Sequence, residues 1–232
     1  MTIESEDLLN SILSSLSRID YIKPDSIPNI DLYMDQITTF MDTQLAASKR
    51  YPDDKILTKT MINNYAKNNL LPPPVKKKYT KEHVLLLIFI YYFKNILSIN
   101  DIQNILNPLT ERFFAADESF NLTDIYEEVF SLESEEVKNV MRDITKKYNT
   151  SHKTFEDAAP EDQEFLHSFS FICMLSFDVF IKRMLLEKLI DLQNDQLKEE
   201  AEKKAAAKKA TESKKAAESK KTAEAKKATE TK

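Results

Sequence analysis

The sequence predicts an all-α protein, and three features of its 232 residues lead to that class. The chain contains no glycine. An average protein of this length would carry roughly 16 glycines, at a typical share of about 7%. Apolar residues recur at helical spacing through most of the chain. The segments between these runs are rich in Pro, Asn, Asp and Ser, which favour turns. Helices joined by glycine-free loops are therefore expected.

The lack of glycine also excludes several classes of functional site. Glycine supplies positive φ angles and lets a backbone approach phosphate groups closely. A P-loop, a glycine-rich dinucleotide fingerprint and a nucleophile elbow all depend on it, so none is expected. Two-residue hairpin turns also lose their preferred residue, although asparagine can replace it.

Cysteine usage and the N-terminal residues indicate a cytoplasmic protein. Cys173 is the single cysteine, so no disulfide can form within the chain, and no Cys/His cluster has zinc spacing. This usage fits a reducing compartment. Residues 1–7 carry Glu4, Glu6 and Asp7, whereas a secretory signal would begin with basic residues. No uncharged apolar run is long enough for a membrane span.

Two helices are predicted before residue 50. The first begins at Ser5, and its apolar residues recur at helical spacing up to Ile19. Pro24 and Pro28 separate it from the second helix. The apolar face of the second helix consists of Ile30, Met34, Ile37, Met41 and Leu45.

A short helix and a buried helix follow. Thr58 is a suitable N-cap for a helix that runs to about Asn68, and the prolines at 72–74 end it. Thr80 precedes a helix that contains ten consecutive apolar residues, 84–93. That run is too long for an ordinary strand, so it indicates a helix buried on most sides.

The remaining chain is also predicted to be helical. Ser98 and Asp101 have the capping-box pattern at the start of a helix that ends before Pro108. Further helices are expected over residues 122–132, after an N-cap at Ser134, and from Pro160 onward. The last of these is apolar on all sides between residues 165 and 192, so it must be covered by the rest of the fold or by a second subunit. Its phenylalanines are interpreted as core or dimer interface, and Cys173 as a core residue rather than a nucleophile.

Charge is distributed unevenly along the chain. The net charge is −5, yet residues 58–98 hold seven Lys and one acidic residue, Glu82. Residues 99–197 hold 9 basic and 20 acidic side chains. A basic island in an acidic chain is typical of a phosphate-binding face, although a lysine-rich surface exposed to solvent would look the same. After Leu197 the Lys/Ala/Glu repeats predict an exposed helix that frays into disorder. We expect this tail to be solubilising, and the alternative is nonspecific attraction to DNA.

The basic island contains a candidate DNA-binding surface. In the predicted helix 58–68, Met61, Ile62 and Tyr65 form a buried face, and the remaining side chains are short, polar or cationic. Such side chains suit base edges and phosphates. A basic wing at 76–79 follows. The predicted contacts to double-stranded DNA are Thr58, Lys59, Thr60, Asn63, Asn64, Tyr65, Lys67, Lys76, Lys77, Lys78 and Tyr79.

These residues resemble those of a known family. The run LTKTMINNYAKNNLLPP is similar to the recognition helix and the start of the wing in MerR-type regulators, with Thr58 at the family's Ser, Tyr65 at its second Tyr and Pro73 at its Pro. Asn69 stands where that family has a glycine, and asparagine tolerates the left-handed region better than most residues. Over about residues 20–185 the chain is similar to an uncharacterised bacterial family, a domain of unknown function with a MerR-like head. The resemblance implies a winged helix-turn-helix whose first helix lies in residues 31–45.

Four segments are expected on this basis: an N-terminal helix and linker (1–28), a MerR-like helix-turn-helix domain (29–107), a helical C-terminal region for dimerisation (108–197), and the charged tail (198–232). The predicted function is that of a DNA-binding transcriptional regulator, homodimeric through the C-terminal helices. The alternative is a helical protein-interaction or scaffold protein without DNA binding, which the acidic body slightly favours.

No enzymatic activity, metal or cofactor is expected. His83, His152 and His167 are far apart in the sequence and have no helix-spaced partner. The adjacent pairs Glu127–Glu128 and Glu135–Glu136 are interpreted as solvated helix surface rather than acid–base machinery.

Overall fold

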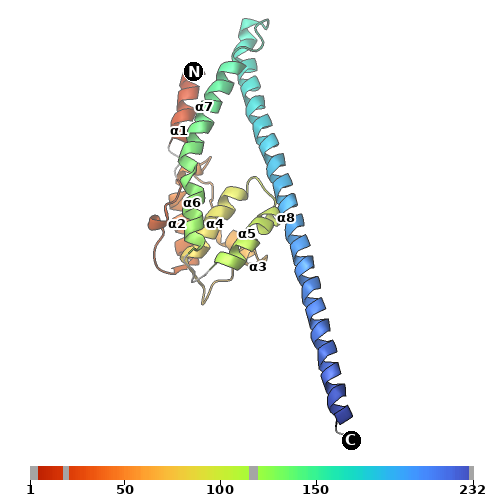
Figure 1. Ribbon diagram of the computed structural model, residues 1–232. Coiled ribbons are helices and arrows are strands. Elements are labelled where there is room, and N and C mark those ends of the chain that lie inside the picture. The colour runs from red at the N-terminus through yellow and green to blue at the C-terminus, as the bar shows by residue number, and fades with distance from the viewer. Residues whose placement is uncertain (1–4, 18–20, 115–119, 230–232) are drawn as a thin grey trace. The chain divides into compact units, whose positions relative to one another are not determined.

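The computed structural model describes residues 5–17, 21–114 and 120–229, and these residues are mostly helical, as predicted (Figure 1). Contacts divide the chain into two units, Met1–Leu185 and Leu186–Lys232, which are described separately. The helices among the described residues are α1 (Ser5–Leu16), α2 (Met34–Gln44), α3 (Lys59–Lys67), α4 (Lys81–Phe93), α5 (Ile99–Phe113), α6 (Leu122–Ser131), α7 (Glu133–Ser151) and α8 (Pro160–Thr229). Two short 3-10 helices, Pro24–Ser26 and Ala46–Ser48, lie on either side of α2.

Two short strands accompany the helices. β1 (Leu32–Tyr33) pairs antiparallel with β2 (Lys78–Tyr79), so that Leu32 lies opposite Tyr79. The strands join the start of α2 to the start of α4, and α2 also contacts α3 and β2. This small ladder is the one departure from an all-α architecture among the described residues.

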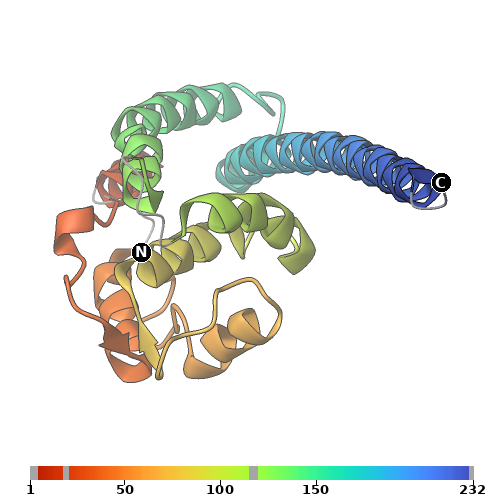
Figure 2. The same ribbon diagram turned by 60° about the horizontal axis from the view of Figure 1, so that its bottom comes forward.

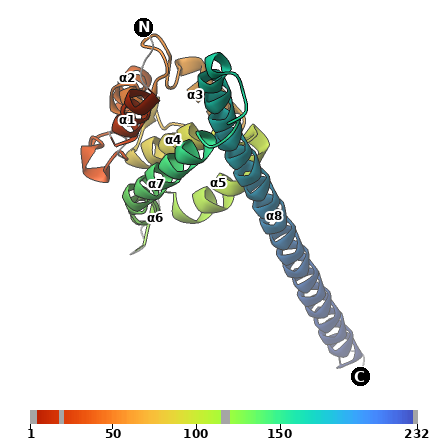
Figure 3. The same cartoon turned by 90° about the horizontal axis from the view of Figure 1, so that it is seen from above.

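Helix α4 forms the centre of the first unit. Its residues 83–90 are all buried, which confirms the prediction of a helix covered on most sides. It contacts α5, α6 and β2, and Figure 3 shows α5 and α6 beside it. Between α4 and α6, the ring of Phe89 lies 5.7 Å from that of Tyr126 and 5.3 Å from that of Phe130, measured between centroids. This packing gives the unit a rigid aromatic core.

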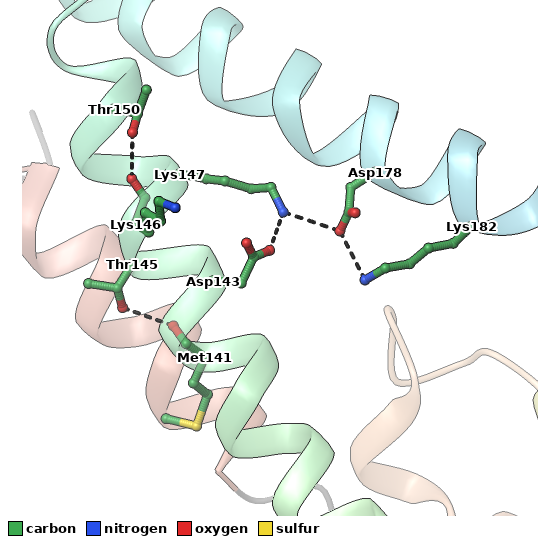
Figure 4. Close-up of polar contacts among 8 residues, drawn as sticks. All are labelled: Met141, Asp143, Thr145, Lys146, Lys147, Thr150, Asp178 and Lys182. Atoms are coloured by element: carbon green, nitrogen blue, oxygen red, sulfur yellow. Dashed lines mark hydrogen bonds and ion pairs between the residues drawn. The ribbon is translucent and has the colours of Figure 1, made fainter.

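A second, smaller core joins α1, α7 and the first part of α8. Leu9, Ile144 and Phe171 are buried together, one from each helix, and α1 lies along α7 in Figure 1. An ion-pair network links α7 to α8 beside this core (Figure 4). Lys147 contacts Asp143 and lies 3.2 Å from Asp178, which in turn lies 3.2 Å from Lys182.

Several predicted helix ends differ from those of the structure. Ser134 lies inside α7 rather than at its N-cap, which is Leu132, because α7 begins almost directly after α6. Pro108 lies inside α5, which continues to Phe113. The buried Ile102 and Leu106 hold that helix against the core, so packing outweighs the missing N–H of the proline. Ile30 is 67% exposed and precedes α2 instead of joining its apolar face.

The remaining part of the chain is a single helical segment. The described residues of unit 2, 186–229, are the remainder of α8. Its surface ion pairs include Lys203–Glu199, at 3.5 Å. Among the described residues of both units, no helix is both long enough and apolar enough to cross a bilayer.

Candidate nucleic-acid interface

Helix α3 has a buried side and a polar exposed side, as the sequence predicts. Ile62 and Tyr65 are buried, with exposed fractions of 0% and 6%, and Met61 is partly buried. Lys59, Asn63 and Lys67 follow one another at four-residue intervals on the exposed side, and Thr60 and Asn64 form the adjacent row. The exposed side therefore presents two lysines, two amides and a hydroxyl to solvent.

Local interactions fix both ends of α3. The hydroxyl oxygen of Thr58 accepts a 3.2 Å hydrogen bond from the backbone N–H of Met61, which confirms the predicted N-cap. At the other end Asn69 has a φ of 56°, in the left-handed region. The N–H of Leu70 then donates to the carbonyl of Tyr65 at 2.9 Å, which closes the helix in the manner of a glycine C-cap.

The loop before α3 is held by a lysine that the sequence did not single out. Lys94, at the end of α4, donates a 2.8 Å hydrogen bond to the carbonyl of Ile56. Burial lowers the pKa of Lys94. Ile56 and Leu57 are themselves buried, so the segment that leads into α3 is anchored to the core.

The predicted wing is a tight two-residue turn. The N–H of Lys78 donates to the carbonyl of Val75 at 2.9 Å, and residues 75 and 78 form an isolated antiparallel bridge. Lys76 and Lys77 have φ angles of 51° and 63°. Two successive left-handed residues define a type I′ turn, which normally takes Asn-Gly. Asparagine is the residue expected to replace glycine in such a turn, whereas this chain uses two lysines.

The wing lysines differ in their surroundings. Lys76 and Lys77 are exposed at the turn, while Lys78 is partly buried and its ammonium lies 5.7 Å from the centre of the Tyr33 ring. Figure 2 shows α3, β1 and β2 along the lower edge of the first unit. Lys59, at the start of α3, forms an exposed ion pair with Asp35 of α2, which places one carboxylate at the margin of the basic surface.

Two predicted contact residues belong to the core. Tyr65 and Tyr79 are only 6% and 3% exposed, and burial raises the pKa of both phenols. Neither ring can offer more than a small edge to a nucleic acid, because each fills the space beneath α3 or β2. Their structural role is to support the surface rather than to form it.

The histidines do not lie as the sequence suggested. The rings of His152 and His167 are 5.0 Å apart between centroids, because the turn from α7 to α8 brings them together. His83 is buried, and its Nδ1 accepts a 3.0 Å hydrogen bond from the N–H of Thr80 at the start of α4. Burial lowers the pKa of His83, and the carbonyls of Pro72 and Pro73 offset part of that effect. Within the described ranges, no group of three or more His, Cys, Asp or Glu side chains could hold a metal ion.

One family model covers the candidate surface, and that family has no assigned activity. Residues 22–129 of this mostly helical chain match the model of a domain of unknown function, DUF1836. The matched range begins before β1 and ends within α6, so it includes α2, α3 and the wing turn. No curated protein and no solved structure matches the chain.

Proposed function

We propose that the protein binds double-stranded DNA and acts as a transcriptional regulator. The observation that supports this best is the exposed side of α3, where Lys59, Asn63 and Lys67 lie in one row beside Thr60 and Asn64. Cations provide attraction to phosphates, and amides can recognise base edges through paired hydrogen bonds. A helix with this side chain set suits a major groove.

The elements around α3 support a helix-turn-helix arrangement. α2 contacts α3, and residues 45–58, which include the 3-10 helix Ala46–Ser48, join them, so α2 would be the first helix and α3 the recognition helix. The turn at 75–78 follows α3 and would form the wing. Asn69 adopts the left-handed conformation that the MerR-type pattern assigns to glycine at this place, which is consistent with a MerR-like head.

Each group of side chains has a distinct role in the proposal. Lys76 and Lys77 at the exposed turn contact phosphates, because lysine is a flexible point charge without base specificity. Asn63 and Asn64 contact base edges, where asparagine pairs best with adenine. Tyr65 and Tyr79 are left out of the interface because they are buried.

The distribution of charge favours binding of DNA to one face of the domain. The basic segment 58–98 is the part of the domain that would attract DNA, while the acidic residues in 99–197 would repel it. Repulsion elsewhere would favour an orientation in which α3 and the wing meet the DNA first. The attraction should be strongest at low ionic strength.

The alternative function is that of a helical interaction or scaffold protein without DNA binding. The observation in its favour is the set of large apolar side chains on α8, among them Phe165 and Ile172, that are exposed in the first unit. Exposed apolar surface of this kind is typical of protein contacts. It does not require the lysines of the wing.

A salt series separates the two functions. Fluorescence anisotropy with genomic duplex fragments should give a negative slope of log K against log salt concentration. The triple variant K76A/K77A/K78A should make that slope shallower by about 0.9 for each phosphate that the lysines no longer neutralise. The matched control is K138A/K146A/K153A, which removes three exposed lysines of the α7 region and should leave the slope unchanged. Absence of binding at low salt would exclude DNA binding and leave the scaffold function.

A further inference from the structure

Helix α8 exposes a row of large apolar residues within the first unit. Phe165, Phe169, Ile172 and Val179 are 70%, 52%, 60% and 64% exposed. An adjacent side of the same helix is already occupied, because Phe171 and Leu175 pack with α7 and α1. The exposed row therefore lies beside the side that packs on α7, with Val179 at the margin between them, and most of its apolar surface is exposed.

The spacing of this row is that of a coiled-coil seam. Phe165, Phe169, Ile172, Ser176, Val179 and Arg183 follow one another at alternating intervals of four and three residues. This alternation is the a/d pattern of the heptad repeat, in which the partner is another α-helix. We call these six residues the α8 seam.

We propose that the α8 seam pairs with the α8 seam of a second copy of this chain, and that the two helices run antiparallel. Ile172 of each copy then lies opposite Ser176 of the other, with Phe169 opposite Val179 and Phe165 opposite Arg183. The proposal goes beyond DNA binding and does not depend on it. A closed two-fold pair is the commonest form of self-association.

Side-chain size favours this orientation. In the antiparallel pair the two central large residues each meet a smaller one, Phe169 against Val179 and Ile172 against Ser176, and such alternation fills an interface evenly. In a parallel pair with the two copies in register, Phe169 would meet Phe169 and Ser176 would meet Ser176. The two serines would leave a gap between the phenylalanine layers.

Charge favours the same orientation. α8 begins with the acidic residues Glu161, Asp162 and Glu164, and the seam ends at the basic residue Arg183. An antiparallel pair brings the acidic end of one copy to the basic end of the other at both ends of the seam. A parallel pair would place Arg183 against Arg183 and the two acidic ends together, and like charges at such positions are unfavourable.

A single substitution in the seam tests for self-association. The variant F169E, in full-length protein, should raise the dimer dissociation constant measured by sedimentation equilibrium by at least about a hundredfold, because each dimer would bury two unpaired carboxylates. The matched control is F177E, since Phe177 is 64% exposed on the same helix but lies off the seam. A protein that stays monomeric at every concentration would overturn the proposal, as would an equal effect of the two substitutions.

Cysteine exchange tests the orientation. In a C173S background, I172C protein is mixed with a mass-tagged S176C protein and oxidised gently. The antiparallel pair predicts disulfides mainly between the two species, because residue 172 of one copy faces residue 176 of the other. Disulfides mainly within each species would show a parallel pair and overturn the assigned orientation. Neither measurement involves DNA, so their failure is distinguishable from failure of DNA binding.

Discussion

The hydroxyl of Tyr126 donates a 2.7 Å hydrogen bond to the backbone carbonyl of Ile22, and the bond is buried. It links α6 to the segment that precedes α2, two regions 104 residues apart in sequence. Burial raises the pKa of this phenol, so the group stays neutral and keeps its donor proton. The bond thus helps to fix the N-terminal segment on the domain that carries α3.

Removing this donor should destabilise the first unit. The variant Y126F keeps the ring and its packing but leaves the carbonyl of Ile22 buried without its partner, which costs about 1–3 kcal/mol. Urea unfolding followed by tyrosine fluorescence measures the change. The control is Y21F, because the Tyr21 ring stacks on Phe130 at 6.1 Å while its hydroxyl forms no hydrogen bond within the described residues. Equal destabilisation of the two variants would show that the bond contributes little.

The left-handed residue at the end of α3 gives a second prediction. Asn69 has a φ of 56°, a conformation that glycine adopts without strain and alanine does not. The variant N69G should unfold at the same or a higher urea concentration, whereas N69A should be less stable by about 1 kcal/mol. The comparison is made at constant protein concentration. A stable N69A variant would contradict the assigned backbone conformation.

The ion pairs between α7 and α8 give a prediction about pH. Hydrogen bonds from Lys182 and Lys147 hold the pKa of Asp178 below its ordinary value of 3.8. A lowered carboxyl pKa contributes stability above the ordinary value, and this stability is lost as the pH falls through the lowered value. Asp143 and Asp178 raise the pKa of Lys147, whose contribution is present below 10.5 and is lost at higher pH. The network therefore stabilises the α7–α8 pair across the neutral range.

The variant D178N should abolish the part of the acid-induced loss of stability that Asp178 causes. At neutral pH it should cost up to about 1 kcal/mol, because the pair is partly exposed and solvent screens it. As the pH falls below the lowered pKa of Asp178, variant and parent should converge in their free energies of unfolding. The control D157N changes an exposed carboxylate in the loop between the same helices and should unfold like the parent at every pH.

Local patterns predicted most of the helices, since caps and apolar spacing act over a few residues. Thr58, Ser98 and the run at 84–93 all lie where these patterns placed them. The errors in helix ends arise where packing against residues distant in the sequence decides how far a helix extends. Pro108 stays within α5 because Ile102 and Leu106, just before it, are buried against the core, and nothing near residue 108 in the sequence indicates that support.

Predicting the candidate site was harder than predicting the helices. The exposed row on α3 follows from helical spacing, but the burial of Tyr65 and Tyr79 depends on how α3 and β2 sit on the core. The proximity of His152 and His167 depends on the turn between α7 and α8, which brings residues 15 positions apart to ring contact. The wing at 76–79 was predicted, but the type I′ conformation of Lys76 and Lys77 was not, because lysine is an unusual choice where asparagine and glycine are preferred.

At the wing turn, one pair of substitutions should change stability and DNA affinity in opposite directions. Lys76 and Lys77 both hold positive φ angles, and such a conformation costs about 1 kcal/mol or more for a residue other than glycine, asparagine or aspartate. The variant K76N/K77G supplies the preferred residues of a type I′ turn. It should therefore unfold at a higher urea concentration than the parent.

If the lysines contact phosphates, K76N/K77G should also bind duplex DNA more weakly, with a slope of log K against log salt concentration that is shallower by about 0.9 for each phosphate left without its lysine. K76R/K77R keeps both charges and the strain, so it should retain the slope of the parent without becoming more stable. A variant that is more stable and keeps full DNA affinity would show that the turn lysines lie outside the interface.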